Sequence, residues 1–507
     1  MKTTGYRKRT TLILFFLLLV RFWIGQTFEV SGREAYLWLL GHGPNLDWGY
    51  LNTGVLVPWL IRLGTLFFGN TELGVRWLAA VIYSCSGFVI FWCARRWFNP
   101  ASAFWTMIIF VCTPLYTWQL LLMNEATASF GLMALALLAY REAVNSDKWL
   151  WYIAAGAISG LAIHVLWFNM IWPLGLLLYY FIEPRRRQLL RHWQHWVMPV
   201  TVLIVSIPIF LWYQRPEMEG LKKLHPLPIS GISHGFSLLA GLEFTLTQIW
   251  LLSPAFFLGM LLAFYYAGSI TFRHHRYALL LCICLPGLLI QYISSFFHAA
   301  NADAMPALYL PALFLSGNLW ASFAQRETRW KWIGVGLLTL AGLQSLGGLI
   351  PATSHYVGFG SGLYPPYSYR NLADEMTRRM QEKGATVAVA EDAETASALT
   401  FYLPRQQLAY VVARHGVRSQ FDFWPNYDDF NGYNFILVTG GNRPAPAIFT
   451  KGFFKVDPIS DAQIPGSESV GWQLYYCENF QGGVGGTLKD IPAEAVHDLE
   501  SSTPLPK

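Results

Sequence analysis

The chain has 507 residues, of which 54% are hydrophobic and only 13% are charged, with a net charge of +6. Soluble domains carry about a quarter charged residues, so this composition excludes an ordinary soluble protein and indicates a polytopic membrane protein. The small positive charge does not indicate a nucleic-acid partner. The positions of its Lys and Arg residues beside apolar runs are more informative, because they set the orientation of membrane spans.

Eleven apolar runs predict about eleven membrane-spanning helices of about 20 residues each. The first, residues 12–28, follows a basic N-terminal segment and precedes no cleavage site typical of a signal peptide, so we expect an uncleaved span. Residues 54–68 predict an amphipathic helix on the membrane surface. The later runs are residues 75–92, 101–118, 128–140, 150–166, 168–182, 197–213, 249–267, 277–296, 306–323 and 332–350.

Alternate connections between these runs are basic, which predicts that they share the cytoplasmic side with the N-terminus. An odd number of spans then places the C-terminal part outside the cytoplasm. We therefore expect a multi-pass protein of the plasma (inner) membrane, with a cytoplasmic N-terminus and an extracytoplasmic C-terminal domain. The basic connections are residues 95–96, 141–148, 185–191, 273–276 and 326–331.

Hydropathy falls from residue 352 onward, and the pattern becomes that of a soluble α/β unit. Helices are predicted at 371–383 and 395–402, and strands at 386–390 and 435–439. Two domains follow from this change. Residues 1–351 form a membrane domain that includes a first outer loop at 29–74, and residues 352–507 form a soluble extracytoplasmic domain with a mobile tail beyond 482.

The first outer loop combines carboxylates with aromatic side chains beside the bilayer. Such acids are suited to general-base work on a polar group that a lipid delivers. The alternative is an interfacial aromatic belt with solvated acids, which these residue types also form. The residues concerned are Glu34, Asp47, Tyr36, Trp38, Trp48 and Tyr50.

Several stretches are similar to the motifs of one family. Residues 33–38 read R-E-A-Y-L-W and residues 46–55 read L-D-W-G-Y-L-N-T-G-V. Residues 398–404 read A-L-T-F-Y-L-P and residues 419–425 read S-Q-F-D-F-W-P. The chain thereby resembles the bacterial dolichyl-phosphate-mannose–protein mannosyltransferase-like glycosyltransferases, relatives of the aminoarabinose transferase of lipid A. Their corresponding motifs are D-E-A-Y-Y-W, L-D-W-G-Y-F-D-H-P-P, E-L-A-F-Y-L-P and Q-Y-D-L-W-P.

The resemblance implies the membrane-embedded C-type glycosyltransferase fold. It also implies transfer of a sugar from a polyprenyl-phosphate donor to a lipid, glycan or protein acceptor at the outer face of the membrane. In the family a first-loop acid acts as base, and basic or metal-bound groups hold the lipid phosphate. No cofactor is expected with certainty, and the sequence leaves open whether a divalent metal is bound.

The departures from the family pattern fall on the chemistry. Arg33 replaces the family's usual catalytic Asp, and residues 52–55 replace its D-H-P-P. Glu34, Asp47 and Glu125 are therefore the predicted catalytic residues. Glu34 is favoured as base, and Arg33 is expected to hold the donor phosphate, since a guanidinium has a suitable fork of donors. We expect the three acids to converge on one outward-facing cavity with Trp38, Trp48 and Tyr50 in its walls.

Other polar and aromatic residues of the outer connections are candidates for binding the substrates, with solvated or interfacial roles as the alternative. No metal ligand is assigned. The predicted substrate-binding residues are Arg33, Tyr36, Trp38, Trp48, Tyr50, Asn52, Arg62, Lys222, Lys223, His225, His298 and Asp303.

A second hypothesis is a catalytically inactive glycosyltransferase-like scaffold or a lipid-binding protein in an envelope-polysaccharide pathway, because several polar positions of the family site have changed together. Transport is less favoured, since acids within the apolar runs are nearly absent.

Overall fold

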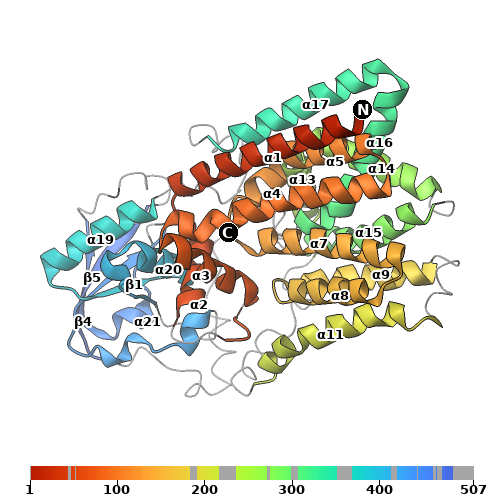
Figure 1. Ribbon diagram of the computed structural model, residues 1–507. Coiled ribbons are helices and arrows are strands. Elements are labelled where there is room, and N and C mark those ends of the chain that lie inside the picture. The colour runs from red at the N-terminus through yellow and green to blue at the C-terminus, as the bar shows by residue number, and fades with distance from the viewer. Residues whose placement is uncertain are drawn as a thin grey trace.

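The computed structural model shows a bundle of long helices with a sheet-bearing unit at one end (Figure 1). The sheet-bearing unit consists of the elements from residue 369 to residue 480. The described residues are 2–43, 47–51, 53–182, 191–215, 236–270, 274–297, 306–350, 368–412, 419–441, 443–460, 464 and 471–482.

The helices of the bundle coincide with all eleven apolar runs of the sequence. Their bounds are α1 (Lys2–Thr27), α2 (Gly32–His42), α3 (Leu56–Phe68), α4 (Glu72–Trp97), α5 (Pro100–Cys112), α6 (Pro114–Gln119), α7 (Glu125–Ser146), α8 (Trp149–Ile163), η1 (Trp167–Met170), α9 (Ile171–Ile182), α11 (Gln194–Tyr213), α13 (Leu238–Leu251), α14 (Pro254–Ile270), α15 (His275–Ser295), η4 (Pro306–Tyr309), α16 (Leu310–Arg326) and α17 (Thr328–Gly347).

Six helical segments of the described chain are long and apolar enough to cross a membrane: α1, α4, α7, α11, α15 and η4 with α16. The bent pair α13 and α14, with 103° between its halves, raises the number to at most seven. Because α5, α8 and η1 with α9 are shorter, helix length and composition do not support the expected count of eleven. The polytopic helical architecture itself is confirmed.

The first outer loop also differs from expectation, because residues 32–42 of it form the helix α2. The helix expected near residues 54–68 is present as α3. Its buried face includes Val57, Ile61 and Gly64, whereas Leu66 and Phe67 are exposed.

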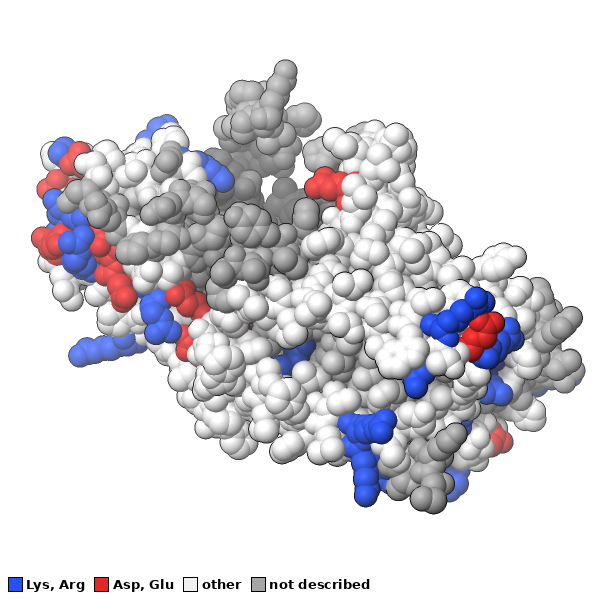
Figure 2. All heavy atoms as spheres, turned by 90° about the horizontal axis from the view of Figure 1, so that it is seen from above, with Lys and Arg blue, Asp and Glu red and all other residues white. Residues whose placement is uncertain are grey.

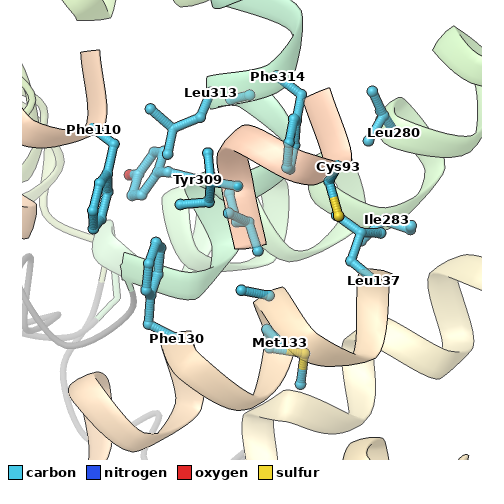
Figure 3. Packing of buried hydrophobic residues seen from close by; sticks show 14 of the residues in the cluster. Cys93, Phe110, Phe130, Met133, Leu137, Leu280, Ile283, Tyr309, Leu313 and Phe314 are labelled. Carbon is cyan, nitrogen blue, oxygen red and sulfur yellow. The ribbon is translucent and has the colours of Figure 1, made fainter. Parts of the chain in front are cut away.

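The core of the bundle lies where α4, α5, α7, α15 and α16 meet (Figure 3). Phe110 of α5 stacks on Phe130 of α7 with ring centroids 5.4 Å apart. Lipid tails are as apolar as these side chains, so close packing holds membrane helices together. At Gly317 of α16 an added Cβ would lie 2.0 Å from the Thr106 hydroxyl, so α5 and α16 approach each other through a residue without a side chain.

The sheet-bearing unit holds α19 (Tyr369–Lys383), β1 (Val387–Ala390), α20 (Ala393–Tyr402), η5 (Pro404–Gln406), β2 (Ala409–Val411), η6 (Gln420–Phe423), η7 (Tyr427–Asp429), β3 (Phe435–Thr439), α21 (Ala447–Thr450), β4 (Phe453–Ile459) and β5 (Gln473–Phe480). The strand order is β2-β1-β3-β5-β4. β1 is parallel to β2 and β3, whereas β5 is antiparallel to β3 and β4. The two predicted helices and two predicted strands are present. The expected domain boundary at residue 352 and the tail beyond 482 lie outside the described residues and stay predictions.

The helix α2 is held between the bundle and the sheet-bearing unit. Trp38 of α2 meets Phe401 of α20 edge-on, with ring centroids 5.0 Å apart. The Tyr36 hydroxyl accepts a hydrogen bond of 3.0 Å from the backbone N–H of Gln420, and the Tyr402 hydroxyl accepts one of 2.7 Å from Val30. These contacts fix the position of α2 against the sheet-bearing unit.

Charge is unevenly distributed along the molecule. On the face in Figure 2, acidic and basic side chains gather over the sheet-bearing end, and basic side chains with a few acidic ones lie toward the opposite end. Uncharged atoms cover most of the surface between. This distribution is typical of a protein whose middle section lies in a bilayer.

Candidate functional site

The first turn of α2 is organised by a capping box. Ser31 is the N-cap, and its hydroxyl accepts from the backbone N–H of Glu34, while the Glu34 carboxylate accepts from the backbone N–H of Ser31. This arrangement pairs two backbone donors that a helix start would otherwise leave without partners. The side chains of Arg33 and Glu34 therefore extend from α2 in fixed and different directions.

The Glu34 carboxylate is buried and paired with groups of the protein. Its side chain is 0% exposed and accepts hydrogen bonds from Arg76 of α4, at 2.8 Å from Nε to Oε1 and 2.5 Å from Nη2 to Oε2. The backbone N–H of Met123 donates to Oε1 at 3.1 Å. A general base must reach the proton that it removes. Burial and full pairing of both oxygens therefore argue against the expectation that Glu34 is the base.

Glu125 has the more accessible carboxylate. It begins α7, after the N-cap Asn124, and forms an ion pair with Arg33 of α2. The Thr53 hydroxyl donates to the same oxygen, Oε1, at 2.7 Å. The Arg33 and Glu125 side chains are 33% and 14% exposed, so both reach the surface. We name Arg33, Thr53 and Glu125 the outer polar cluster.

The loop that carries Thr53 lies directly on the ends of α8 and α11. A Cβ added at Gly54 would lie 1.5 Å from the backbone oxygen of His164, and one at Gly49 would lie 2.2 Å from the Trp212 ring. A backbone bridge between Tyr50 and Thr53 closes the turn. These close approaches place Thr53 against Glu125.

Charges of the sheet-bearing unit reach the same cluster. Burial opposes the charge of Arg33, but Glu125, and further off Glu394 at the start of α20, raise the pKa of this guanidinium. The cation is therefore retained across the working pH range. Burial raises the pKa of Tyr36, one turn further along α2, to about 12. Tyr36 is accordingly a neutral hydroxyl.

Residues 52–212 match the family model of the dolichyl-phosphate-mannose-protein mannosyltransferases. The lipid A galacturonosyltransferase RgtD of Rhizobium johnstonii is 24% identical over 392 residues, which cover 75% of this chain and 79% of that protein. The resemblance to this family is confirmed.

Solved structures agree on the fold. ArnT from Cupriavidus metallidurans bound to undecaprenyl phosphate superposes with a TM-score of 0.63 and 16% identity, covering 93% of this chain and 98% of that one. The apo form of that protein gives 0.59 and 17%, covering 86% and 93%. The chain has the C-type glycosyltransferase fold.

The outer polar cluster contains two of the positions at which this chain departs from the family motifs that it resembles. In the motifs that residues 33–38 and 46–55 resemble, the position of Arg33 corresponds to an Asp and that of Thr53 to a His. The acid of this cluster is supplied by Glu125, which lies 92 positions away along the chain from Arg33. Thr53 is a member of this cluster that the sequence did not single out, although its place in the altered D-H-P-P motif was the available signal.

Asp47 is paired with residues outside the outer polar cluster. One carboxylate oxygen pairs with Arg215, at the end of α11, at 2.7 Å, and the other accepts from the backbone N–H of Trp48, also at 2.7 Å. These contacts fit a residue that orders the turn. Convergence of all three acids on one cavity stays a prediction.

The aromatic candidates divide by burial. Trp38 and Tyr50 are buried, and the Tyr50 hydroxyl donates to the backbone oxygen of Leu40 at 3.1 Å. Both contribute to packing rather than to an open wall. Trp48 is exposed and meets Trp59 edge-on, and Arg62 is exposed with one donor on the backbone oxygen of Gly41. These exposed residues remain available to a ligand.

The remaining sequence candidates cannot be placed. Asn52, Lys222, Lys223, His225, His298 and Asp303 lie outside the described residues.

The described residues do not bring together a full set of side-chain ligands for a divalent metal. Such a cation needs several oxygen or nitrogen ligands. Among the residues with described positions, no three His, Cys, Asp or Glu side chains lie close enough to hold one. At the outer polar cluster the positive charge beside Glu125 is the guanidinium of Arg33.

Proposed function

We propose that this protein is an integral membrane glycosyltransferase that transfers a sugar from a polyprenyl-phosphate-linked donor to an envelope lipid, glycan or protein acceptor. The family match, the similarity to a lipid A galacturonosyltransferase and the similarity to ArnT bound to undecaprenyl phosphate support this activity. The basic connections support a location in the plasma (inner) membrane, with the sheet-bearing unit outside the cytoplasm.

The observation that carries the assignment of roles is the ion pair between Arg33 and Glu125. It places a cation and a carboxylate side by side, partly exposed, at the sheet-bearing end of the bundle. A sugar phosphate needs a cation for its phosphate, and the acceptor hydroxyl needs a base. The pair supplies one of each.

In the reaction that we propose, the donor phosphate takes the Arg33 guanidinium as its partner. Glu125 is then released from Arg33 and keeps its hydrogen bond from Thr53. The acceptor oxygen attacks the anomeric carbon, its proton passes to Glu125, and the bond from carbon to phosphate oxygen breaks. Polyprenyl phosphate leaves with one more negative charge, which Arg33 stabilises.

The inactive scaffold is the second candidate, and one observation favours it. Arg33 replaces the family's acid and also forms the ion pair with Glu125. In a scaffold this pair would serve only to hold α2 against α7. An acid in the first turn also stabilises a helix without any chemistry. A transfer assay separates the two candidates.

The assay uses purified full-length protein in lipid vesicles, a panel of radiolabelled polyprenyl-phosphate-linked neutral, amino and uronic sugars, and lipid A as one acceptor. We expect transfer by the wild type and a loss of about 10²–10⁴-fold in Glu125→Gln, as for other general bases. Asp374→Asn is the matched control, because Asp374 is an exposed acid on α19. Donor binding without transfer on the whole panel would establish the scaffold instead.

The proposed orientation is tested separately. A reporter that is active only in the cytoplasm should be inactive when it is fused after Lys507 and active when it is fused before Lys2. Activity of the C-terminal fusion would reverse the orientation.

A further inference from the structure

A second cluster of basic residues lies around a cavity at the other end of the bundle. The cavity has a volume of about 340 Å³ and lies between the last turns of α4, α7 and α9 and the first turn of α15. Its lining includes Arg96, Arg141 and Arg276, and no acid lines it among the described residues. We name it the basic pocket.

The basic pocket is far from the outer polar cluster. Glu125 begins α7, and Asn145, which lines the pocket, is near the end of that helix. Twenty residues of α-helix span about 30 Å, close to the thickness of the hydrocarbon core of a bilayer. The pocket therefore belongs to the opposite membrane face, where Figure 2 shows basic side chains.

The arginines of the pocket gather around the end of α4. Arg96 and Arg141 both bond to Oε1 of Glu142, and Arg141 also donates to the backbone oxygen of Arg96 at 3.1 Å. Arg276 donates to the backbone oxygen of Trp97. Carbonyls at a helix end favour cations nearby, which explains in part why the arginines lie here.

Those contacts do not neutralise all of the positive charge of the three arginines or use all of their N–H donors. Three guanidinium groups face one carboxylate, that of Glu142, and each guanidinium has five N–H donors. The Arg141 side chain is only 15% exposed, and its Nε is buried without a hydrogen-bond partner in the described part of the chain. A buried donor without a partner is costly. An anion in the pocket would balance the positive charge and accept from the guanidinium donors that face the cavity.

Most of the other residues that line the pocket are apolar or aromatic, although Asn145 and His275 also line it. Trp97, Val144, Tyr179 and Leu279 line it beside the arginines. Aromatic residues of this kind are common where a membrane protein meets the lipid headgroups. The helices α4, α7 and α15 are each long enough to span a membrane, so their ends lie at the depth of lipid phosphates. The combination suits an amphiphile with a phosphate group.

We propose that the basic pocket binds a phosphate group, held by Arg96, Arg141 and Arg276, and that an anionic membrane phospholipid supplies it. Basic pockets between spanning helices on the cytoplasmic side recognise such headgroups. Guanidinium groups suit phosphate because they form paired, charge-assisted hydrogen bonds. This site does not depend on the transferase activity, since it lies on the other side of the bundle.

The test is native mass spectrometry of the purified full-length protein with three probes: phosphatidylglycerol, zwitterionic phosphatidylcholine and inorganic phosphate. We expect wild type to retain phosphatidylglycerol and to exclude phosphatidylcholine. In Arg276→Gln the affinity should fall about tenfold, the loss expected for one charge-assisted hydrogen bond. Arg276→Lys should recover part of it.

Arg329→Gln is the matched control, because Arg329, at the start of α17, is a basic residue outside the pocket and 70% exposed. Equal elution volumes in size exclusion establish that the variants are folded. Inorganic phosphate bound by wild type and lost in Arg276→Gln, with no lipid retained, would assign the pocket to a soluble phosphate compound. Equal retention of all probes by wild type, Arg276→Gln and Arg329→Gln would overturn the proposal.

Discussion

Arg76 and Glu34 form an ion pair that is closed to solvent, with the two side chains 3% and 0% exposed. Arg76 also donates to the backbone oxygens of Phe28 and Glu29 at 2.7 and 2.6 Å. One guanidinium thereby joins α4 to the end of α1 and the first turn of α2. The pair explains why the acid beside the altered family position is fixed in place.

The first prediction concerns the stability that this pair provides. Glu34→Gln leaves the buried charge of Arg76 without its counter-charge, which typically costs about 3–5 kcal/mol. The melting temperature of the purified protein in detergent should therefore fall markedly. Arg370→Gln, which breaks the exposed pair with Glu72, is the control and should cost at most about 1 kcal/mol. If Glu34→Gln melts at the same temperature as the wild type but transfers no sugar, Glu34 is the base and the structural role is wrong.

The second prediction separates the roles of Arg33 and Glu125. Arg33→Gln removes the proposed phosphate contact and leaves Glu125 in place, so the KM for the donor should rise about tenfold or more. Arg33→Asp places a second carboxylate beside Glu125 and should lose transfer altogether. Initial rates over a range of donor concentrations measure both effects. Transfer by Arg33→Asp at or above the wild-type rate would show that the family's own base position still operates.

The third prediction concerns the approach of Gly54 to α8. A methyl group at this position meets the backbone oxygen of His164, which cannot move without moving the end of the helix. Gly54→Ala should therefore displace Thr53 from Glu125, cost about 1–3 kcal/mol of stability and reduce transfer. Gly336→Ala in α17 is the control, because no atom lies within 4 Å of the added carbon, and it should leave both properties unchanged or slightly improve stability. Equal transfer by the two variants would contradict the proposed place of Thr53 in the site.

The fourth prediction is a pH dependence at His42, the last residue of α2. Burial lowers the pKa of His42, the Trp38 carbonyl raises it, and the charge of Arg62 lowers it further, with a net lowering. The unfolded chain therefore binds a proton first as the pH falls, so this residue destabilises the fold progressively below its unfolded pKa of about 6.5. His42→Gln should flatten the decline in melting temperature below that pH. A decline that is the same in both proteins would exclude His42 as its source.

Hydropathy and charge were sufficient to predict the helical membrane architecture and the α/β character of the C-terminal part. The lengths of the helices were not predicted correctly, because α5 and α8 end after 13 and 15 residues although their apolar runs continue. Apolar composition does not distinguish a residue inside a helix from one in the turn that follows it. By length and composition, six or seven helical segments of the described residues are long enough to cross a membrane, fewer than the eleven apolar runs.

The candidate site could be predicted only in part. The sequence analysis favoured Glu34 as the base, whereas the spacing of Ser31 and Glu34 matches a capping box, and the structure shows that Glu34 has this capping role. In contrast, the ion pair between Arg33 and Glu125 joins positions 92 residues apart, and no local pattern reports such a contact. The same is true of Gly54, because the reason for a glycine there is the carbonyl of His164 on another helix.

The contacts of α2 with the sheet-bearing unit have a consequence for evolution and engineering. Tyr36 and Trp38 pack on η6 and α20, and the Ser368 hydroxyl at the start of α19 donates to Glu29 just before α2. A chimera that takes its C-terminal part from one relative and its bundle from another would mismatch these surfaces. It should regain activity when residues 29–42 come from the same parent as the C-terminal part. We therefore expect these two segments to be inherited together even though more than 300 residues separate them.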